Sequence, residues 1–190
     1  MNELELPRFQ TQRLLLRPAE ESDVPEILDF FTRNQAHLGP TDPIRPEGFF
    51  TPEFWRRQIL KNLEDLQAGR SLRTFLFLGP DFRRVVGTAN LSEIIRGAFH
   101  SCFLGFSLDG AEQGKGLMTE GLRALISCAF DELNLHRISA NHMPHNRKSA
   151  AVLRRLGFVP EGYARDYLMI AGRWEDHVLT SLLNDRWRKS

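Results

Sequence analysis

The sequence predicts an α/β protein (α+β in some classification schemes) with a mixed central sheet of about seven strands and helices on both faces. Short apolar segments of strand length alternate with longer segments whose apolar residues recur at helical spacing. Clusters of glycine, proline and aspartate separate these segments. The resulting order, β-α-α-β-β-β-α-β-α-β-β, indicates a mixed sheet rather than an all-helical or all-β chain.

The first half of the chain predicts one strand and two helices. Ser22 and Thr51 are suitable N-cap residues for these helices, and Pro52 fits the first helical position after Thr51. The segment between the helices is rich in proline, glycine and aspartate, which is typical of a loop. These elements are expected at residues 12–17 (strand), 22–34 (helix), 37–50 (loop) and 51–69 (helix).

The second half predicts three strands in an antiparallel meander, then a long helix, and then alternating elements that end in a hairpin. Gly79 and Gly97 mark the turns of the meander, and Gly172 marks the hairpin. The expected elements are strands at 73–78, 85–95 and 99–108, a helix at 117–133, a strand at 137–142, a helix at 145–156, and strands at 163–170 and 174–182.

Length and composition limit the function classes. A chain of 190 residues favours a single domain, residues 1–190. The net charge of +1 argues against a broad nucleic-acid surface, so no direct DNA binding is expected. No apolar run reaches the ~20 residues that span a bilayer. Residues 1–7 lack a secretory leader, and two cysteines without metal-ligand spacing suit a reducing compartment. We therefore expect a cytoplasmic protein with no membrane partner.

The segment 105–118 carries the most chemical information. A strand ends, a glycine-rich turn follows, and a helix begins, so unpaired backbone N–H groups and the positive end of the helix dipole form an anion site. Gly114 and Gly116 let the backbone approach a phosphate closely. A P-loop is excluded because Gly116 stands where its hydroxyl residue would be, and a dinucleotide fingerprint lacks its third glycine. The alternative is an ordinary helix start with two turn glycines.

Residues 113–120, together with Asn146–Ser149 at the start of a helix that ends at 156–158, resemble the GNAT acetyltransferase superfamily. The family's pyrophosphate loop, [QR]-x-x-G-x-[GA], maps onto residues 111–116 with Ala111 as a departure at the first position. The resemblance covers about residues 12–187. Four further blocks resemble the bacterial RimJ/RimL type of ribosomal-protein N-terminal alanine acetyltransferase, with the RimJ side the closer: residues 95–102, 140–146, 161–168 and 172–179.

This resemblance implies a GNAT fold and acetyl-CoA as cosubstrate, with no metal. Backbone amides of the loop would bind the pyrophosphate. The strand that precedes it would hold the acetyl-pantetheine arm and donate an N–H to the thioester carbonyl. Asn146 would hold the pantetheine arm, although its only role could also be to cap its helix. The implied coenzyme-binding residues are Phe106, Ser107, Leu108, Gln113, Gly114, Lys115, Gly116, Leu117, Met118 and Asn146.

The resemblance further implies transfer of acetyl to the N-terminal alanine of a small-subunit ribosomal protein by direct attack, with possible ribosome association. An α-amino group has a pKa of ~7.7–8.0 against ~10.4 for lysine, so it asks less of a general base. We expect Asp166 to act as that base through water, with Glu93 as the competitor. Ser149 matches the family's proton donor to the thiolate, and Tyr163 or Tyr167 stay open as alternatives.

The acceptor, the activity and the role of Asp166 each have an alternative interpretation. The acceptor could instead be a small amine or an antibiotic, and the protein could be a non-catalytic acetyl-CoA-binding module associated with the ribosome. Asp166 could be an ordinary strand carboxylate paired with Arg165 or Arg173. The histidines at 136, 142 and 145 lack a metal-ligand spacing. We also expect a bipolar cleft, in which carboxylates border the acceptor end: Glu93, Glu120, Glu161 and Asp166.

Overall fold

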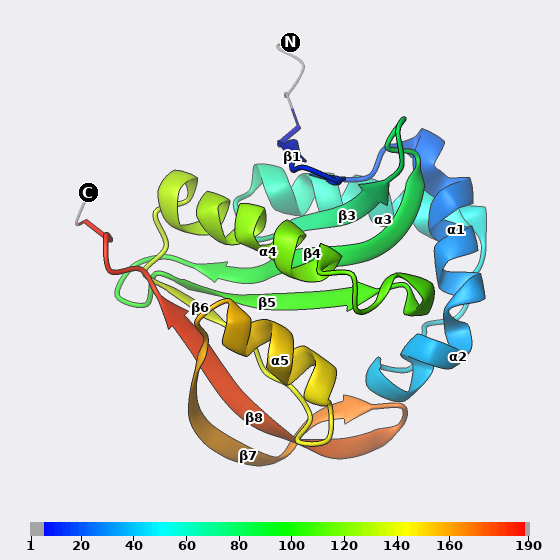
Figure 1. Cartoon of the computed structure of the whole chain (residues 1–190). Coiled ribbons are helices and arrows are strands. Elements are labelled where there is room, and N and C mark those ends of the chain that lie inside the picture. Colours follow the sequence, from blue (N-terminus) through cyan, green and yellow to red (C-terminus); the bar gives the residue numbers. More distant parts are fainter. Residues whose placement is uncertain (1–5, 189–190) are drawn as a thin grey trace.

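The computed structural model of the chain describes residues 6–188, which form one eight-stranded sheet with helices on both faces (Figure 1). Residues 1–5 of the segment considered above for a leader therefore lie outside the described part. The sheet order is β1-β2-β3-β4-β5-β6-β8-β7, and β5 and β6 run parallel. The strands are β1 (Phe9–Gln10), β2 (Leu14–Arg17), β3 (Leu72–Leu78), β4 (Arg84–Ile95), β5 (Ser101–Leu108), β6 (Arg137–Ser139), β7 (Val159–Ile170) and β8 (Arg173–Leu183).

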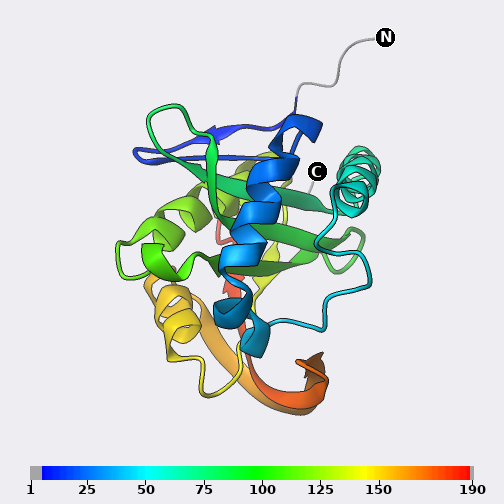
Figure 2. The ribbon, with the colours of Figure 1, turned by 90° about the vertical axis from the view of Figure 1, so that its right-hand side faces the viewer.

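Five α-helices cover the sheet, with α3 on one side and α4 and α5 on the other (Figure 2). Within residues 6–188, none of them combines the length and the apolar character that crossing a bilayer requires. The helices are α1 (Val24–Arg33), α2 (Gln35–Leu38), α3 (Pro52–Gln67), α4 (Leu117–Ser127) and α5 (Arg147–Arg155).

Alternate residues of the strands pack into two hydrophobic clusters, one on each face of the sheet. Leu14, Leu16 and Leu76 are fully buried in the cluster that includes residues of α4 and α5. Leu15 and Phe77 point to the other face and pack with residues of α1 and α3. This alternation explains why short apolar strands in the sequence correspond to a sheet covered on both faces.

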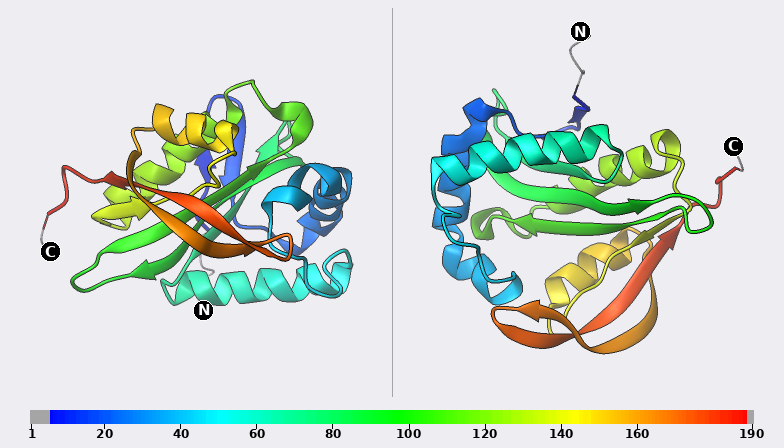
Figure 3. Two further views of the ribbon diagram at one scale, coloured as in Figure 1. Left: turned by 90° about the horizontal axis from the view of Figure 1, so that it is seen from below. Right: turned by 180° about the vertical axis from the view of Figure 1, so that it is seen from behind.

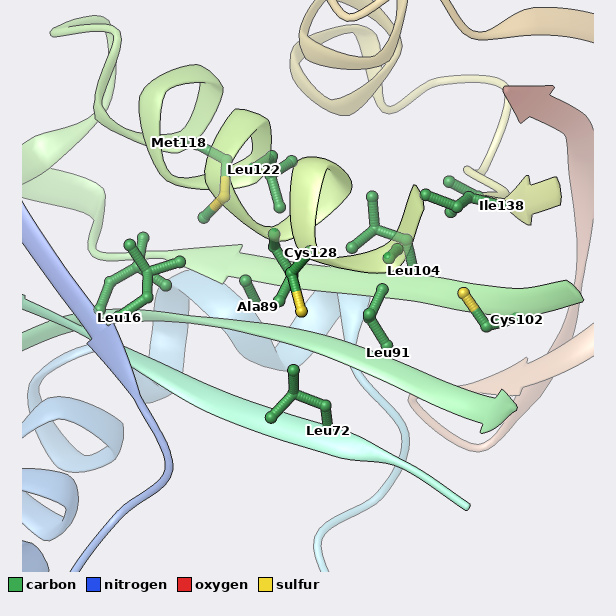
Figure 4. Packing of buried hydrophobic residues seen from close by; sticks show 14 of the residues in the cluster. Leu16, Leu72, Ala89, Leu91, Cys102, Leu104, Met118, Leu122, Cys128 and Ile138 are labelled. Atoms are coloured by element: carbon green, nitrogen blue, oxygen red, sulfur yellow. The ribbon is translucent and has the colours of Figure 1, made fainter. Parts of the chain in front are cut away.

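Helix α4 covers one face of the sheet with residues spaced three and four apart (Figure 4). Met118, Leu122 and Leu125 are buried against the strands. A turn of π-helix at Cys128–Glu132 continues α4, which accounts for the predicted helix at 117–133. The first turn of this helix is therefore fixed relative to the sheet.

The helix starts were predicted with mixed success. Thr51 caps α3 as predicted, because its Oγ1 accepts a hydrogen bond from the Phe54 N–H at 3.3 Å. The prediction of Ser22 as a cap was wrong. Residues Glu20 and Asp23 cap a 3-10 turn at 21–23 instead, with Asp23 Oδ2 accepting from the Glu20 N–H at 2.7 Å. The helix α1 then begins at Val24.

The structure contains a short helix, a 3-10 turn and a strand that the sequence did not predict. The loop expected at 37–50 is partly helical, since α2 runs to Leu38 and a 3-10 turn follows at Gly39–Thr41. The sheet has eight strands instead of about seven, because the short β1 pairs with β2. The antiparallel meander of β3, β4 and β5 is confirmed.

The strand predicted at 137–142 is only half as long as expected, and this difference creates the site. Strands β5 and β6 pair over three residue pairs, from Ser101 to Phe103 on β5. After β6 the chain turns toward β8, where His142 forms an isolated bridge with Val178. Residues 104–108 of β5 consequently have a strand partner only on the β4 side.

The β7–β8 hairpin extends from the sheet, and its tip lies beside the segment that follows α2 (Figure 3). The Ala171 N–H at the tip donates a hydrogen bond to the Asp42 carbonyl oxygen at 3.0 Å. A register shift between Ala164 and Leu168 marks a bulge in β7. The first and last thirds of the chain thus meet at one end of the gap beside β5.

Candidate functional site

A cavity of about 1140 Å³ fills the gap that opens where β5 and β6 diverge. The free half of β5, the loop before α4, and the first turns of α4 and α5 line it. The segment after β6, helix α2 and the inner face of the β7–β8 hairpin complete the wall. All the predicted coenzyme-binding residues line this cavity except Lys115.

The free edge of β5 presents backbone N–H groups to the cavity. The Asp109 N–H donates to the Val86 carbonyl oxygen on β4 at 2.8 Å, whereas the His100 carbonyl faces the β6 side and accepts from the His136 N–H. Because hydrogen-bonding directions alternate along a strand, Phe106 and Leu108 direct their N–H groups away from β4 and into the gap. This edge can hold an extended ligand that carries carbonyl groups.

The loop before α4 is an anion site built from the backbone. Gly114 and Gly116 adopt φ values of +76° and +79°, which favour glycine. The first helical hydrogen bond is that of the Glu120 N–H to the Gly116 carbonyl at 3.1 Å. Among the described residues, no acceptor is found for the N–H groups of residues 114–119. These free donors and the positive end of the α4 dipole suit a phosphate.

Buried acids anchor this loop from below. Asp109 accepts hydrogen bonds from Arg33 Nε at 2.8 Å and from the Ala111 N–H at 3.0 Å. Burial alone would raise the pKa of Asp109, but these hydrogen bonds and the charge of Arg33 outweigh it and lower the pKa. The Lys115 ammonium binds Glu112 at 2.8 Å, so this side chain points away from the cavity. The Lys115 charge is therefore directed to Glu112 rather than to the cavity.

Glu112 is held ionised by the same kind of contact. A hydrogen bond from Lys115 lowers the pKa of Glu112 below its usual value, and one from Arg84 at 2.9 Å adds to the effect against the opposing effect of burial. The loop is thus tied to β4 by Arg84 and to α1 by Arg33. A loop held at both sides keeps its amides aimed in one direction.

Besides Arg13, which pairs with Glu120, four cations on the cavity wall were missed by sequence reasoning. Arg147 and Lys148 directly follow Asn146, and their position at a helix start beside the predicted loop was the available signal. Within residues 6–188, none of the three arginines of this group forms an ion pair. Lys148 donates to Gln113 Oε1. The four are Arg123, Arg147, Lys148 and Arg155.

Asn146 and Ser149 lie together at the start of α5, as predicted. Asn146 Oδ1 accepts a hydrogen bond from the Ser149 N–H at 3.1 Å, so Asn146 does cap its helix. Its Nδ2 has no protein partner within the described part of the chain and belongs to a residue that lines the cavity. The Ser149 hydroxyl is likewise without a protein partner in residues 6–188, and Ser149 also lines the cavity.

The structure does not bring the two predicted general bases to the cavity. Asp166 lies in the bulge of β7 with φ +48°, and its N–H binds Asp176 Oδ1 at 2.9 Å. Glu93 lies in a bulge of β4 with φ +50°. Both side chains are exposed, and neither lines the cavity. Bulges change which face a side chain occupies, and strand alternation alone could not place them.

The two tyrosines also lie outside the cavity wall. The Tyr163 hydroxyl donates to Asp176 at 2.5 Å on the exposed face of the hairpin, and this hydrogen bond raises the pKa of Tyr163. The Tyr167 hydroxyl accepts from Asn141 Nδ2 at 3.1 Å. Neither hydroxyl is placed to protonate a group held inside the cavity.

The expected border of four carboxylates at the acceptor end was wrong. Only Glu120 of that set lines the cavity, and Arg13 binds it at 2.7 Å. Glu161 faces away from the cavity and accepts from Ser181 Oγ at 2.8 Å. The other acid of the wall is Asp42, which was not selected because it lies in a segment interpreted as a loop. Burial raises the pKa of Asp42, against the lowering effect of Arg45 and His37.

Three histidines line the cavity without having been selected from the sequence: His37, His142 and His177. His37 Nε2 lies 2.8 Å from Gln113 Nε2, which links α2 to the loop of residues 109–116 before α4, called the phosphate loop below. Among residues 6–188, no cluster of three or more histidine, cysteine, aspartate or glutamate side chains is arranged to hold a metal ion. The side chains of the cavity wall include cations, imidazoles, hydroxyls and the two acids named above.

Comparison with known proteins gives a consistent result. A family model described as an acetyltransferase (GNAT) domain matches residues 13–159. The chain is 42% identical over 180 residues to the [ribosomal protein uS5]-alanine N-acetyltransferase of Escherichia coli (strain K12), covering 95% of this chain and 92% of that protein.

Solved structures agree in fold over nearly the whole chain. The ribosomal-protein-S5-alanine acetyltransferase of Vibrio fischeri has a TM-score of 0.91 and 40% identity, covering 96% of this chain and all of that one. Mycobacterium smegmatis RimJ in complex with CoA-disulfide has a TM-score of 0.86 and 26% identity, covering 97% of this chain and 90% of that one.

Proposed function

Because the chain belongs to the GNAT acetyltransferase family, we propose that it transfers acetyl from acetyl-CoA to the N-terminal alanine amine of ribosomal protein uS5. The observation that carries the reaction class is the cavity itself, which joins a helix N-terminus rich in free amides to the unpaired edge of β5. The relatives named for uS5 support the acceptor. A cytoplasmic location and contact with the ribosome follow from this acceptor, and residues 1–190 are proposed to act as a single domain.

The residues present fit acetyl-CoA. Amides of residues 114–119 bind the pyrophosphate, and the cations on the wall of α4 and α5 neutralise the remaining phosphate charge. The free N–H groups of Phe106 and Leu108 face the gap, where they hydrogen-bond the pantetheine carbonyls and polarise the thioester carbonyl. The Asn146 amide holds the same arm from the opposite wall. Ser149 donates a proton to the departing sulfur, as its free hydroxyl and position allow.

The geometry favours an α-amine over a lysine side chain. An α-amino group loses its proton with a pKa of ~7.7–8.0, against ~10.4 for lysine, so deprotonation costs about 3.4 kcal/mol less. The cavity wall contains two acids, and one of them, Glu120, is engaged by Arg13. A wall with so few free carboxylates suits the amine that is easier to deprotonate.

The test uses the purified protein, acetyl-CoA and a peptide with the N-terminal sequence of uS5, analysed by mass spectrometry. We expect one acetyl group on the N-terminal alanine and none on an internal lysine. The matched control is the same peptide with a blocked N-terminus, which should stay unmodified. Acetylation of a small amine or an antibiotic in preference to the peptide, or coenzyme binding without any transfer, would contradict the proposal.

A further inference from the structure

The three imidazoles of the cavity differ in which ring nitrogen is available. The His37 Nε2 is occupied, because the neighbouring Gln113 Nε2 is an amide that can only donate. His142 and His177 each place Nδ1 at 2.9 Å from a backbone carbonyl oxygen. A carbonyl cannot donate, so Nδ1 carries the proton in both rings and Nε2 is the lone-pair nitrogen of the neutral form.

His177 is the more constrained of these two rings. Only 4% of the residue is exposed, and the Glu175 carbonyl fixes its Nδ1. Its Nε2 has no hydrogen-bond partner in the described part of the chain, yet it is not among the polar atoms sealed from solvent. The Tyr167 ring packs against it at 5.4 Å. The Tyr167 hydroxyl is held in turn by Asn141 Nδ2 at 3.1 Å.

The hairpin geometry directs this ring into the cavity. On β8, residues two apart share a face, and the strand pairing places Leu168 opposite Glu175 and Ile170 opposite Arg173. Leu168, Ile170 and His177 therefore occupy one face, and all three line the cavity. Trp174, on the opposite face, is 58% exposed. The His177 side chain therefore lies on the face of the hairpin that lines the cavity.

The groups around His177 do not compete for Nε2. On its own strand, the Glu175 side chain pairs with Arg173 at 3.6 Å, and Asp176 faces the other side, where it accepts from Tyr163. From β7 comes the Tyr167 ring. From the segment after β6 comes His142, which pairs with Val178 through its backbone.

We propose that His177 is the catalytic residue that takes the proton from the acceptor amine, an inference that rests on the proposed function. The acceptor arrives as an ammonium group, and His177 Nε2 takes its first proton and releases it to water. The nitrogen lone pair then forms the C–N bond to the acetyl carbon, and the C–S bond breaks with its electron pair on sulfur. The sulfur takes the proton from Ser149 Oγ. The nitrogen then loses its second proton, and this proton restores the Ser149 hydroxyl.

The test compares His177→Asn and His177→Gln with the wild type. Asparagine keeps a donor near Nδ1 for the Glu175 carbonyl, and glutamine places an amide near Nε2, but neither can take up a proton. We expect both variants to bind coenzyme A and unfold thermally as the wild type does, with similar KM for the uS5 peptide. Their kcat at neutral pH should fall about 100-fold, as is usual for loss of a general base.

The pH profile separates catalysis from structure. Because the free amine forms without help above its pKa of ~7.7–8.0, the loss of kcat should shrink as the pH is raised through this range. The matched control is His145→Asn, which removes an exposed imidazole that does not line the cavity and should keep kcat close to wild type.

Three results would overturn the proposal for His177: unchanged kcat in its variants, an equal loss at every pH, or the same pH-dependent loss in His145→Asn. If the wild type acetylates the peptide and the His177 variants match it, this inference alone fails. If the wild type acetylates no peptide, the proposed function fails, and the inference fails with it.

Discussion

The two polar atoms of the Asn146 side chain, at the start of α5, are available for different contacts. Its Oδ1 caps the helix through the Ser149 N–H, and its Nδ2 is left for the cavity. The cap fixes the first turn, so the Ser149 hydroxyl is held beside the same cavity. The structural and the chemical interpretations of Asn146 are therefore compatible.

Ser149→Ala tests the proton donor. Removing the hydroxyl leaves the thiolate, whose thiol pKa is ~8.5, to leave without a proton. We expect kcat to fall about 100-fold with unchanged coenzyme affinity, measured by steady-state kinetics and titration calorimetry. Asp166→Asn is the control, since the exposed Asp166 carboxylate does not line the cavity and should keep turnover. The reverse pattern would restore the interpretation of Asp166 as the base.

The position of a site residue was predictable where its neighbours along the chain determine the local backbone structure. The place of Gln113, Gly114 and Gly116 on the cavity wall was predictable, because a glycine-rich turn before a helix leaves free backbone N–H groups that can bind an anion. His177 was not found, because its role depends on a partner in β7 and on a carbonyl two residues away. No pattern along the sequence encodes that pairing.

At the scale of elements, Glu120 joins the start of α4 to the N-terminal strands. It accepts hydrogen bonds from Thr11 Oγ1 at 2.6 Å and from the Arg13 N–H at 2.8 Å. Burial alone would raise the pKa of Glu120, but these bonds and the charge of Arg13 outweigh it and lower the pKa below 4.5. Ionised Glu120 therefore stabilises the folded state.

Glu120→Gln should reduce the free energy of unfolding at pH 7 by no more than about 1 kcal/mol, since 44% of the Arg13 side chain is exposed to solvent, which screens the pair. Because the pKa of Glu120 is lower in the folded than in the unfolded state, its contribution to the free energy of unfolding is complete above pH 4.5. This contribution is lost as the pH falls through the pKa of Glu120 in the folded state. The difference between variant and wild type should thus vanish in acid, as measured by denaturant unfolding.

The control for this prediction is Glu64→Gln. Glu64 is an exposed residue of α3 that forms no ion pair among residues 6–188. Its stability should match the wild type at every pH. An equal pH-dependent loss in both variants would show that general surface charge, rather than the Glu120 contacts, causes the effect.

Most elements were predictable from periodicity, but their ends were not. The apolar stripe of α4 and the antiparallel meander are encoded locally, and both are confirmed. The early end of β6 at Ser139 is set by the competition between β5 and β8 for the same segment. The sequence around Ala140 continues to favour a strand, so only the tertiary fold shows the divergence that opens the cavity.

For the molecule as a whole, the net charge of +1 conceals a strong local separation of charge. Cations without ion-pair partners in residues 6–188 gather on the wall formed by α4 and α5, whereas the acids under the phosphate loop are neutralised by Arg33, Arg84 and Lys115. A polyanionic ligand therefore meets positive potential although the protein is nearly neutral.

Coenzyme A binding should accordingly weaken with salt. At about 1 M salt the screening length is about 3 Å, so we expect Kd to rise at least about tenfold above its low-salt value in calorimetry. Arg155→Ala should flatten this dependence, because it removes one cation from the cavity wall. Arg83→Ala is the control, since Arg83 is 84% exposed and lies outside the wall. An equal slope in all three proteins would refute the assignment.

The divergence of β5 and β6 has a consequence for the sheet itself. An unpaired strand edge normally lies at the border of a sheet, where another chain can add to it. Here the edge at residues 104–108 lies in the interior, enclosed by α4, α5 and the hairpin. A ligand with its own amide groups that enters this space takes the place of a missing strand. During one turnover, the acetyl-CoA arm would occupy the position of a strand beside residues 104–108 of β5.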